Sequence, residues 1–185
     1  SRWEIKDFID FIKNPKSTVE LQNGQTIHFF PTNKIRIPVD KNTIINNKVV
    51  ASKYNDSIVS YIDIDIKGNA LYKNRLMMLD IIANNNWKRP IYFSPGAFED
   101  EDYLWMKNYL QIEGMVYKLV PIKTKVEKDT NPMDMGGLDA DKMYSIVMKW
   151  DWGNSRGDIY HDPETRKNSI SYRSVLSRLM DKLIA

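Results

Sequence analysis

The sequence predicts a mixed α/β fold: a single domain with a βαβ core and helices packed on a mixed sheet. Two observations point to this class. An apolar helical pattern over residues 69–83 is followed by a proline turn and a short β-prone run at residues 91–93. A second helical pattern over residues 99–112 leads directly into another β-prone run at residues 115–122. Because two strands joined by a helix of this length usually form a parallel, right-handed unit, we expect the βαβ core over residues 91–122.

The length and composition of the chain are those of one globular domain. It has 185 residues, and 42% of them are hydrophobic, which is enough to bury a substantial core. We therefore treat residues 1–185 as a single soluble domain. No stretch approaches the ~20 apolar residues of a membrane-spanning helix. The chain enters a helical pattern directly after Ser1, so we interpret it as a fragment of a longer protein; a serine left by cleavage of a fusion is equally compatible.

The first quarter of the chain predicts a helix followed by a hairpin. Apolar residues recur on one face of residues 3–13, and Asn14-Pro15 ends this helix. Asn23-Gly24 lies between β-prone residues, which is a strong signal for a hairpin turn. A strand over residues 26–30 should follow the turn.

The next segment predicts strands. Residues 34–39 alternate basic residues with isoleucine, and residues 58–66 alternate aspartate with isoleucine, as in a strand that is buried on one face. A short strand is also expected near residues 49–51, inside an otherwise polar connector.

Helices dominate the second half. Gly114 should stop the helix over residues 99–112, and Asp139 should cap a helix over residues 139–150. A last helix is expected over residues 169–184. The residues expected to be mostly buried around the βαβ unit are Ile91, Phe93, Leu104, Leu110, Val116 and Leu119.

Charge and cysteine content exclude several classes of function. The 27 basic and 24 acidic residues give a net charge of +3 and form no dense basic cluster, so we expect no nucleic-acid partner. The absence of cysteine excludes a disulfide scaffold, a thiolate zinc site and a cysteine nucleophile. We expect no cofactor.

Two acidic groups could in principle bind a metal ion. Asp158, His161 and Asp162 could also form an acid–base group, but no second histidine or ordered ligand spacing supports them, and we favour a polar turn. The second group is that of Asp134, Asp139 and Asp141.

That second group surrounds a pair of glycines. The spacing does not follow a calcium-binding EF-hand loop, which needs alternating acidic positions and a glutamate at the twelfth. We favour a glycine loop followed by a capped helix, and we predict no metal site.

A pair of carboxylates could support hydrolysis. Asp63 and Asp65 lie ~7 Å apart on one face of the predicted strand, and paired carboxylates can hydrolyse glycosidic bonds. We favour an exposed polar strand face, and keep a free-standing hydrolase that uses these residues, or Asp158, His161 and Asp162, as a minor alternative.

The loop after residues 91–93 is the predicted binding site, because ligands of open α/β sheets bind at the carboxyl ends of strands. Acidic residues crowd the following helix start and would repel a phosphate, so a neutral sugar is the compatible ligand. The candidate residues for binding a glycan or a partner are Tyr92, Ser94, Phe98, Asp100, Asp102 and Tyr103. The alternative is that the aromatic residues Phe98 and Tyr103 pack inward.

Seven stretches carry a family resemblance that spans nearly the whole chain. They are residues 8–13, 35–40, 66–69, 80–93, 102–121, 143–154 and 172–174. They resemble the C-terminal soluble part of a family of large bacterial multipass membrane proteins of unknown function. Relatives of this family are described as protein O-mannosyltransferase-like, with the membrane core of a lipid-sugar-dependent glycosyltransferase.

The resemblance implies a role without chemistry in this part of the protein. The catalytic acidic residue is expected in the membrane core of the parent, so no catalytic residue is assigned to this chain. The domain is expected at the periplasmic face of the bacterial inner membrane, as an accessory domain that positions an acceptor protein or a glycan. Its expected partners are the membrane core of its own parent chain and that acceptor or glycan. The alternative is a protein–protein assembly module with no sugar role.

Overall fold

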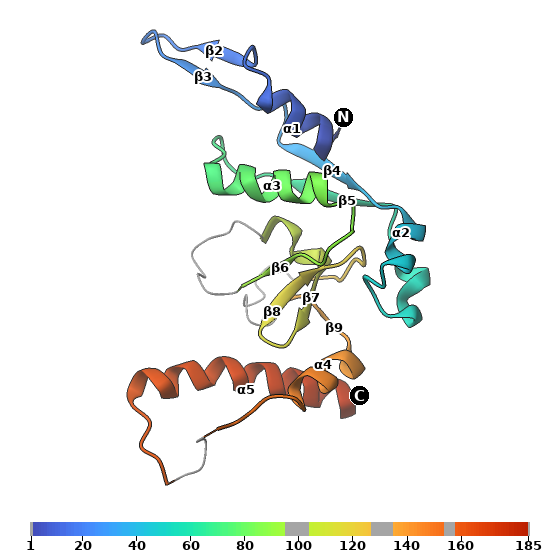
Figure 1. Ribbon diagram of the computed structural model, residues 1–185. Coiled ribbons are helices and arrows are strands. Elements are labelled where there is room, and N and C mark those ends of the chain that lie inside the picture. Colours follow the sequence, from blue (N-terminus) through green and yellow to red (C-terminus); the bar gives the residue numbers. More distant parts are fainter. Residues whose placement is uncertain (1, 95–103, 127–134, 154–157, 185) are drawn as a thin grey trace. The chain divides into compact units, whose positions relative to one another are not determined.

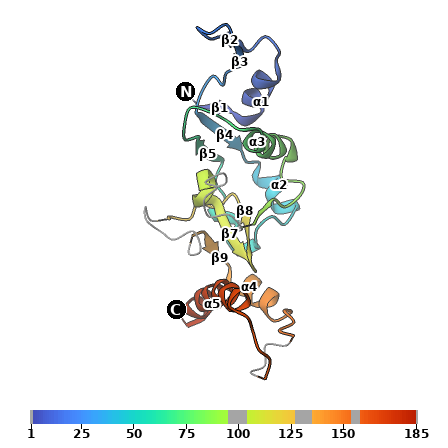
Figure 2. The ribbon, with the colours of Figure 1, turned by 90° about the vertical axis from the view of Figure 1, so that its left-hand side faces the viewer.

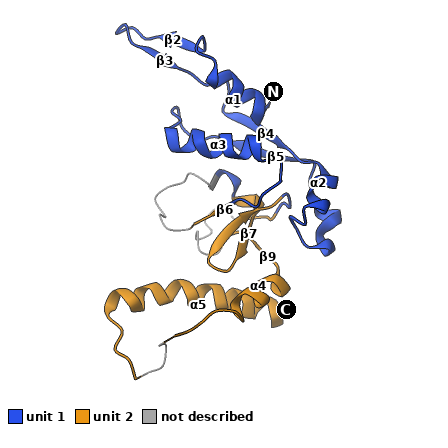
Figure 3. Cartoon of the chain, in the orientation of Figure 1, with its two compact units in different colours: residues 1–91, 101–106, 121–123 blue, residues 92–100, 107–120, 124–185 orange. Residues whose placement is uncertain are grey.

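The computed structural model describes residues 2–94, 104–126, 135–153 and 158–184 (Figure 1). These residues form helices and three small sheets with parallel and antiparallel pairs, so the predicted mixed α/β class is confirmed. The chain divides into two compact units (Figure 3). Unit 1 comprises residues 1–91, 101–106 and 121–123, and unit 2 comprises residues 92–100, 107–120 and 124–185. That residues 1–185 fold as one domain stays a prediction.

A three-stranded sheet forms the centre of unit 1. Strand β1 (Trp3–Glu4) runs parallel to β4 (Lys34–Pro38), which pairs antiparallel with β5 (Tyr61–Asp65). The isoleucines of β4 and β5 lie opposite one another and are buried on one face, whereas the charged residues between them occupy the other face. The half-buried strand predicted within residues 58–66 is therefore confirmed.

Two helices contact each other in unit 1 (Figure 2). Helix α1 (Ile5–Lys13) buries Phe8, and α3 (Lys73–Asn85) buries Leu79. The Lys13 Nζ atom lies 2.7 Å from Asp80 Oδ1 and joins the two helices at the surface.

The prediction of a strand near residues 49–51 is wrong. The Asp40 side chain accepts hydrogen bonds from the backbone N–H groups of Asn42 and Thr43, and this cap begins the short helix α2 (Lys41–Asn46). The 3₁₀ helix η1 (Ser52–Ser57) follows. The polar connector therefore folds as two short helices.

The predicted hairpin is present and extends away from α1 (Figures 1 and 2). Strand β2 (Thr18–Glu20) pairs antiparallel with β3 (Thr26–His28), and Gly24 in the turn has φ = +76°. The apolar residues of this ribbon, Ile27 among them, are exposed within the described chain.

The predicted βαβ core is wrong. In unit 2 the strand order is β6 (Tyr92–Phe93), β8 (Val116–Leu119), β7 (Leu110–Glu113) and β9 (Gly137–Leu138), and β6 is antiparallel to β8. Residues that were expected to finish a helix instead form β7, which pairs antiparallel with β8. The described residues directly before β7 form the 3₁₀ helix η2 (Leu104–Tyr109).

One glycine explains this error. Gly114 has φ = +64°, and a left-handed glycine can either end a helix or form the turn of a hairpin. Residues 110–113 alternate apolar and polar side chains, which suits a strand, so the hairpin forms. Of the six residues expected in the core, Leu110 and Leu119 are buried, Ile91, Phe93 and Val116 are half-buried, and the side chain of Leu104 lies outside the described residues.

Helices α4 (Ala140–Val147) and α5 (Pro163–Ile184) contact each other in unit 2. The predicted cap of the first is confirmed, because the Asp139 carboxylate accepts hydrogen bonds from the N–H groups of Asp141 and Lys142. Helix α5 begins six residues earlier than expected, with proline in its first turn, where a missing N–H costs nothing. No helix among the described residues is both long and apolar enough to cross a membrane.

Gly136 lets β9 approach β7. Its φ is +82°, and a Cβ atom there would lie 2.9 Å from the Leu110 carbonyl oxygen. The Arg178 guanidinium donates hydrogen bonds to the carbonyl oxygens of Met135 and Gly136, which ties α5 to this segment. Both the backbone conformation and the close contact therefore require glycine.

Changing Gly136→Ala should lower the free energy of unfolding by about 3 kcal/mol, because left-handed strain adds to a clash with backbone. The matched control is Gly24→Ala, which also has positive φ but meets nothing within 4 Å. That control should cost about 1 kcal/mol. Urea unfolding measures both, and equal losses would refute the close-contact argument.

Candidate functional sites

The structure describes part of the predicted binding loop. Tyr92 lies on β6 and Ser94 is exposed directly after it. The other four predicted residues, Phe98, Asp100, Asp102 and Tyr103, lie outside the described residues. The binding assignment of all six stays a prediction, and the local geometry can be built from Tyr92.

Tyr92 belongs to a polar cluster on one face of the unit 2 sheet. Lys118 lies opposite Tyr92 in the β6–β8 pair and opposite Gln111 in the β7–β8 pair. Glu113 has only 6% of its surface exposed, and Lys118 has 9%. The Tyr92 hydroxyl donates a hydrogen bond of 2.9 Å to Glu113 Oε2, and Lys118 Nζ donates one of 3.4 Å to Oε1. The Glu113 carboxylate on β7 is thus bound by side chains of β8 and of β6, the strand beyond it.

Burial, and then the hydrogen bond to Glu113, raises the pKa of Tyr92 to about 12. The hydroxyl therefore stays protonated at neutral pH and is committed to Glu113. The residue is nevertheless 44% exposed, which leaves ring surface free to contact a ligand. Sequence reasoning missed Glu113 and Lys118 because it placed residue 113 beside a helix end; a strand reading of residues 110–118 would have found them.

A second charged group lies on the polar face of the unit 1 sheet. Arg36 binds Asp63 through two hydrogen bonds, Nε to Oδ1 at 2.7 Å and Nη2 to Oδ2 at 3.0 Å. Arg2 Nη1 lies 2.7 Å from Asp65 Oδ1, and Arg2 Nε lies 3.4 Å from Asp63 Oδ2. The Arg36 guanidinium also lies 4.4 Å from the centroid of the Tyr61 ring.

This network argues against a hydrolase that uses Asp63 and Asp65. The hydrogen bond from Arg36 lowers the pKa of Asp63, so this carboxyl stays ionised and is a poor proton donor. Asp65 is paired with Arg2 on the same strand face. The two carboxylates join β5 to β4 and to Arg2, which directly precedes β1.

Two of the other acidic candidates, Asp162 and Asp139, cap helices. Asp162 accepts hydrogen bonds from the N–H and the hydroxyl of Thr165, and the N–H bond is the main cause of its lowered pKa. Asp139 caps α4, while Asp134 lies outside the described residues. Within the described part of the chain, no three His, Cys, Asp or Glu side chains gather in a way that could hold a metal ion.

Unit 1 also contains a pocket of about 530 Å³. Its lining comes from residues 27–30, 32 and 33, from residues 68–71, and from Ile12 and Leu76. None of these residues is aspartate, glutamate, lysine or arginine. Sequence reasoning missed the pocket because its walls come from segments far apart in the chain.

The comparison with protein families identifies the domain. The model of the TMEM260-associated domain 2 matches residues 1–142. The chain belongs to this family. TMEM260 is a protein O-mannosyltransferase-like membrane protein, which agrees with the glycosyltransferase association implied by the resemblance. No curated protein and no solved structure matches the chain. The match ends within α4, so α5 lies beyond the matched part of this TMEM260-associated domain.

Changing Asp63→Asn in this TMEM260-associated domain should lower the free energy of unfolding by about 1 kcal/mol at pH 7, because solvent weakens a half-exposed pair. The pKa of Asp63 is lower in the folded state than in the unfolded state. The ionised carboxylate therefore stabilises the fold above the unfolded-state pKa, and this contribution is lost as the pH falls through the folded-state pKa. The difference between variant and wild type should therefore shrink below about pH 4. Urea unfolding at several pH values measures it.

The control for this change is Asp56→Asn, whose fully exposed carboxylate lies 3.7 Å from Lys41 Nζ. It should change stability little at any pH. A loss for Asp63→Asn that stays constant down to about pH 2 would show that packing, and not charge, explains it.

Changing Glu113→Ala should lower the free energy of unfolding by about 3 kcal/mol, because it leaves the Lys118 ammonium buried without its carboxylate. The double change Glu113→Leu with Lys118→Met should recover most of this loss. Thermal and urea unfolding measure both. If the double variant is as unstable as the single one, the loss comes from shape and not from an unpaired charge.

Proposed function

We propose that this domain is the extra-membrane accessory domain of a protein O-mannosyltransferase-like membrane protein, where it positions an acceptor protein or a glycan. The observation that carries the proposal is the family match over residues 1–142. The domain is non-catalytic by itself, and the membrane core of its parent chain performs the sugar transfer.

The side-chain geometry supports binding over catalysis. Asp63 is paired with arginine, Glu113 is paired with lysine, and Asp139 and Asp162 cap helices. Each of these carboxylates already holds a structural partner. The pocket of unit 1, by contrast, has no Asp, Glu, Lys or Arg in its lining.

The glycan contact that we propose lies in the loop after β6. The exposed ring of Tyr92 offers a stacking surface, because its hydroxyl is already bound to Glu113. Ser94, Phe98, Asp100, Asp102 and Tyr103 complete the proposed contact. We further propose that the domain faces the periplasm of a bacterium, at the inner membrane, and contacts the membrane core of its own parent.

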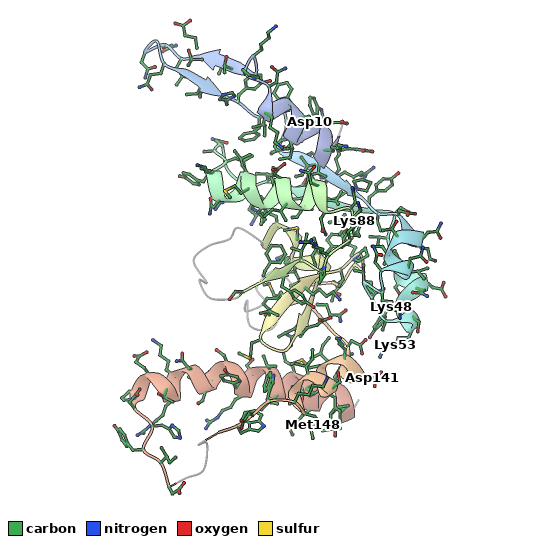
Figure 4. The ribbon with its side chains drawn as sticks, in the orientation of Figure 1. Asp10, Lys48, Lys53, Lys88, Asp141 and Met148 are labelled. Carbon is green, nitrogen blue, oxygen red and sulfur yellow. The ribbon has the colours of Figure 1, made fainter. Side chains whose placement is uncertain are left out.

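The second candidate function is a protein–protein assembly module with no sugar role. Tyr172, Met180 and Leu183 of α5 are exposed and recur at helical spacing. Met148, labelled in Figure 4, is exposed directly after α4. An apolar helix face of this kind suits a partner helix.

Deleting the coding sequence for residues 1–185 in frame from the native gene tests the two functions. The accessory role predicts that hexose disappears from exported proteins in a glycoproteomic comparison, while the membrane core keeps its abundance. Protease added to spheroplasts should cleave the domain of the native membrane protein. The control is Met180→Glu with Leu183→Glu, which should leave glycosylation unchanged. Unchanged glycosylation after deletion, with loss of a membrane complex, would refute the accessory role and favour assembly.

A further inference from the structure

We propose that the free edge of β3 binds an extended, uncharged polypeptide segment by strand addition, with its alternate apolar side chains entering the neighbouring pocket. The inference rests on the proposed function, because it specifies how the domain would hold an acceptor protein. Its argument uses only unit 1.

The backbone of β3 presents unpaired groups on one edge. Phe29 N–H donates to the Ser17 carbonyl and Leu21 N–H donates to the Gln25 carbonyl, so these residues use their backbone groups within the ribbon. Antiparallel pairing alternates, and Thr26 and His28 therefore direct their N–H and C=O groups away from β2. Within the described residues β3 pairs with β2 alone.

The edge of β3 lacks the usual protection against strand addition. Proteins commonly guard an edge with charged side chains or proline. The residues of β3 are threonine, isoleucine and histidine, whereas the opposite edge strand β2 contains Glu20 and follows Lys16. The two edges of one ribbon thus differ, and the open one is the edge next to the pocket.

The pocket fits side chains of such a segment. Its volume of about 530 Å³ lies within the range of ligand sites and exceeds that of one side chain. Ile12, Phe29, Phe30, Leu71 and Leu76 supply apolar surface, and charged residues are missing from the lining. In strand addition, main-chain hydrogen bonds give affinity and pockets for alternate side chains give specificity.

The apolar face of the ribbon adds to this surface. Val19 lies opposite Ile27 in the β2–β3 pair, and both are more than 40% exposed. Phe29 is exposed to a similar degree and also lines the pocket. The surface beside the open edge is therefore apolar and uncharged, which selects against phosphates and other anions and favours a neutral extended chain.

The probe is a fluorescein-labelled seven-residue peptide of alternating threonine and valine with blocked ends. Anisotropy titration of the 185-residue chain should show saturable binding, with amide shifts at residues 26–33. The same peptide with alternate amides N-methylated should not bind, because it cannot form the ladder. Equal binding of both peptides would overturn the proposal, since the pocket alone would then explain the affinity.

A pair of proline variants on the two edges of the ribbon gives the matched control. His28→Pro removes an outward N–H from β3, and Thr18→Pro removes one from β2 directly opposite. His28→Pro should weaken peptide binding about tenfold, and Thr18→Pro should leave it within about twofold. Equal weakening by the two would overturn the proposal.

If His28→Pro disorders the ribbon, Ala70→Trp carries the test, because it fills the pocket from an exposed wall position without changing the edge. It should abolish peptide binding, and unchanged affinity would overturn the proposal.

Amide shifts at residues 26–33 with a mannose disaccharide but not with the peptide would also overturn the proposal. A dimer of the chain that is seen by sedimentation velocity and that His28→Pro dissociates would also overturn the proposal. In that case a second copy of the chain would occupy the edge of β3.

The peptide-binding experiments and the deletion experiment can fail independently of each other. Loss of glycosylation after the deletion, without peptide binding, removes this site and leaves the accessory role. Peptide binding with unchanged glycosylation removes the accessory role and leaves this site.

Discussion

The structure depends on one constraint: short strands that bury one face must pair the charges on their other face with a neighbouring strand. Ile62 and Ile64 of β5 are buried, and the alternation that buries them places Asp63 on the opposite face. Arg36, at the register position across from Asp63, binds its carboxylate through two hydrogen bonds. In unit 2 both faces of β7 are buried, and Tyr92, Glu113 and Lys118 still pair across three strands. In unit 1 the pairing register of β4 and β5 therefore determines both which isoleucines are buried and which charged residues pair.

This constraint also limits the chemistry of the domain. A catalytic acid needs a proton near neutral pH, yet the hydrogen bond from Arg36 lowers the pKa of Asp63. Glu113 is occupied by a tyrosine hydroxyl and an ammonium group. Carboxylates that complete a sheet are not free for substrate, so the recognition that we propose uses the uncharged pocket and the strand edge of unit 1. The physical chemistry therefore agrees with an accessory, binding role.

Sequence reasoning succeeded where one local signal has one meaning. Alternation in residues 58–66 gave the buried strand face, Asn23-Gly24 gave the hairpin, and Asp139 gave the helix cap. It failed at Gly114, because a left-handed glycine is compatible with a helix end and with a hairpin turn. Only pairing with β8 decides between them, and pairing is a tertiary property.

The error at Gly114 spread to the candidate site. Because residues 99–112 were expected to form a helix, the loop before them was predicted as the binding site. Glu113, the hydrogen-bond partner of Tyr92, was missed because it lies on β7, a strand that was not predicted. The pocket of unit 1 could not be read from the chain at all, since residues 27–33 and 68–71 share no periodicity or motif. Sites of this kind depend on which segments the fold brings together.

The open ribbon of unit 1 has an energetic consequence. A two-stranded hairpin is marginal alone, and this one exposes Val19 and Ile27 to water. A third strand would satisfy the outward groups of Thr26 and His28 and cover apolar surface at the same time. Part of the binding free energy would then be used to order the ribbon, which keeps the affinity modest. For the acceptor-holding role that we propose, modest affinity would let one segment leave before the next one binds.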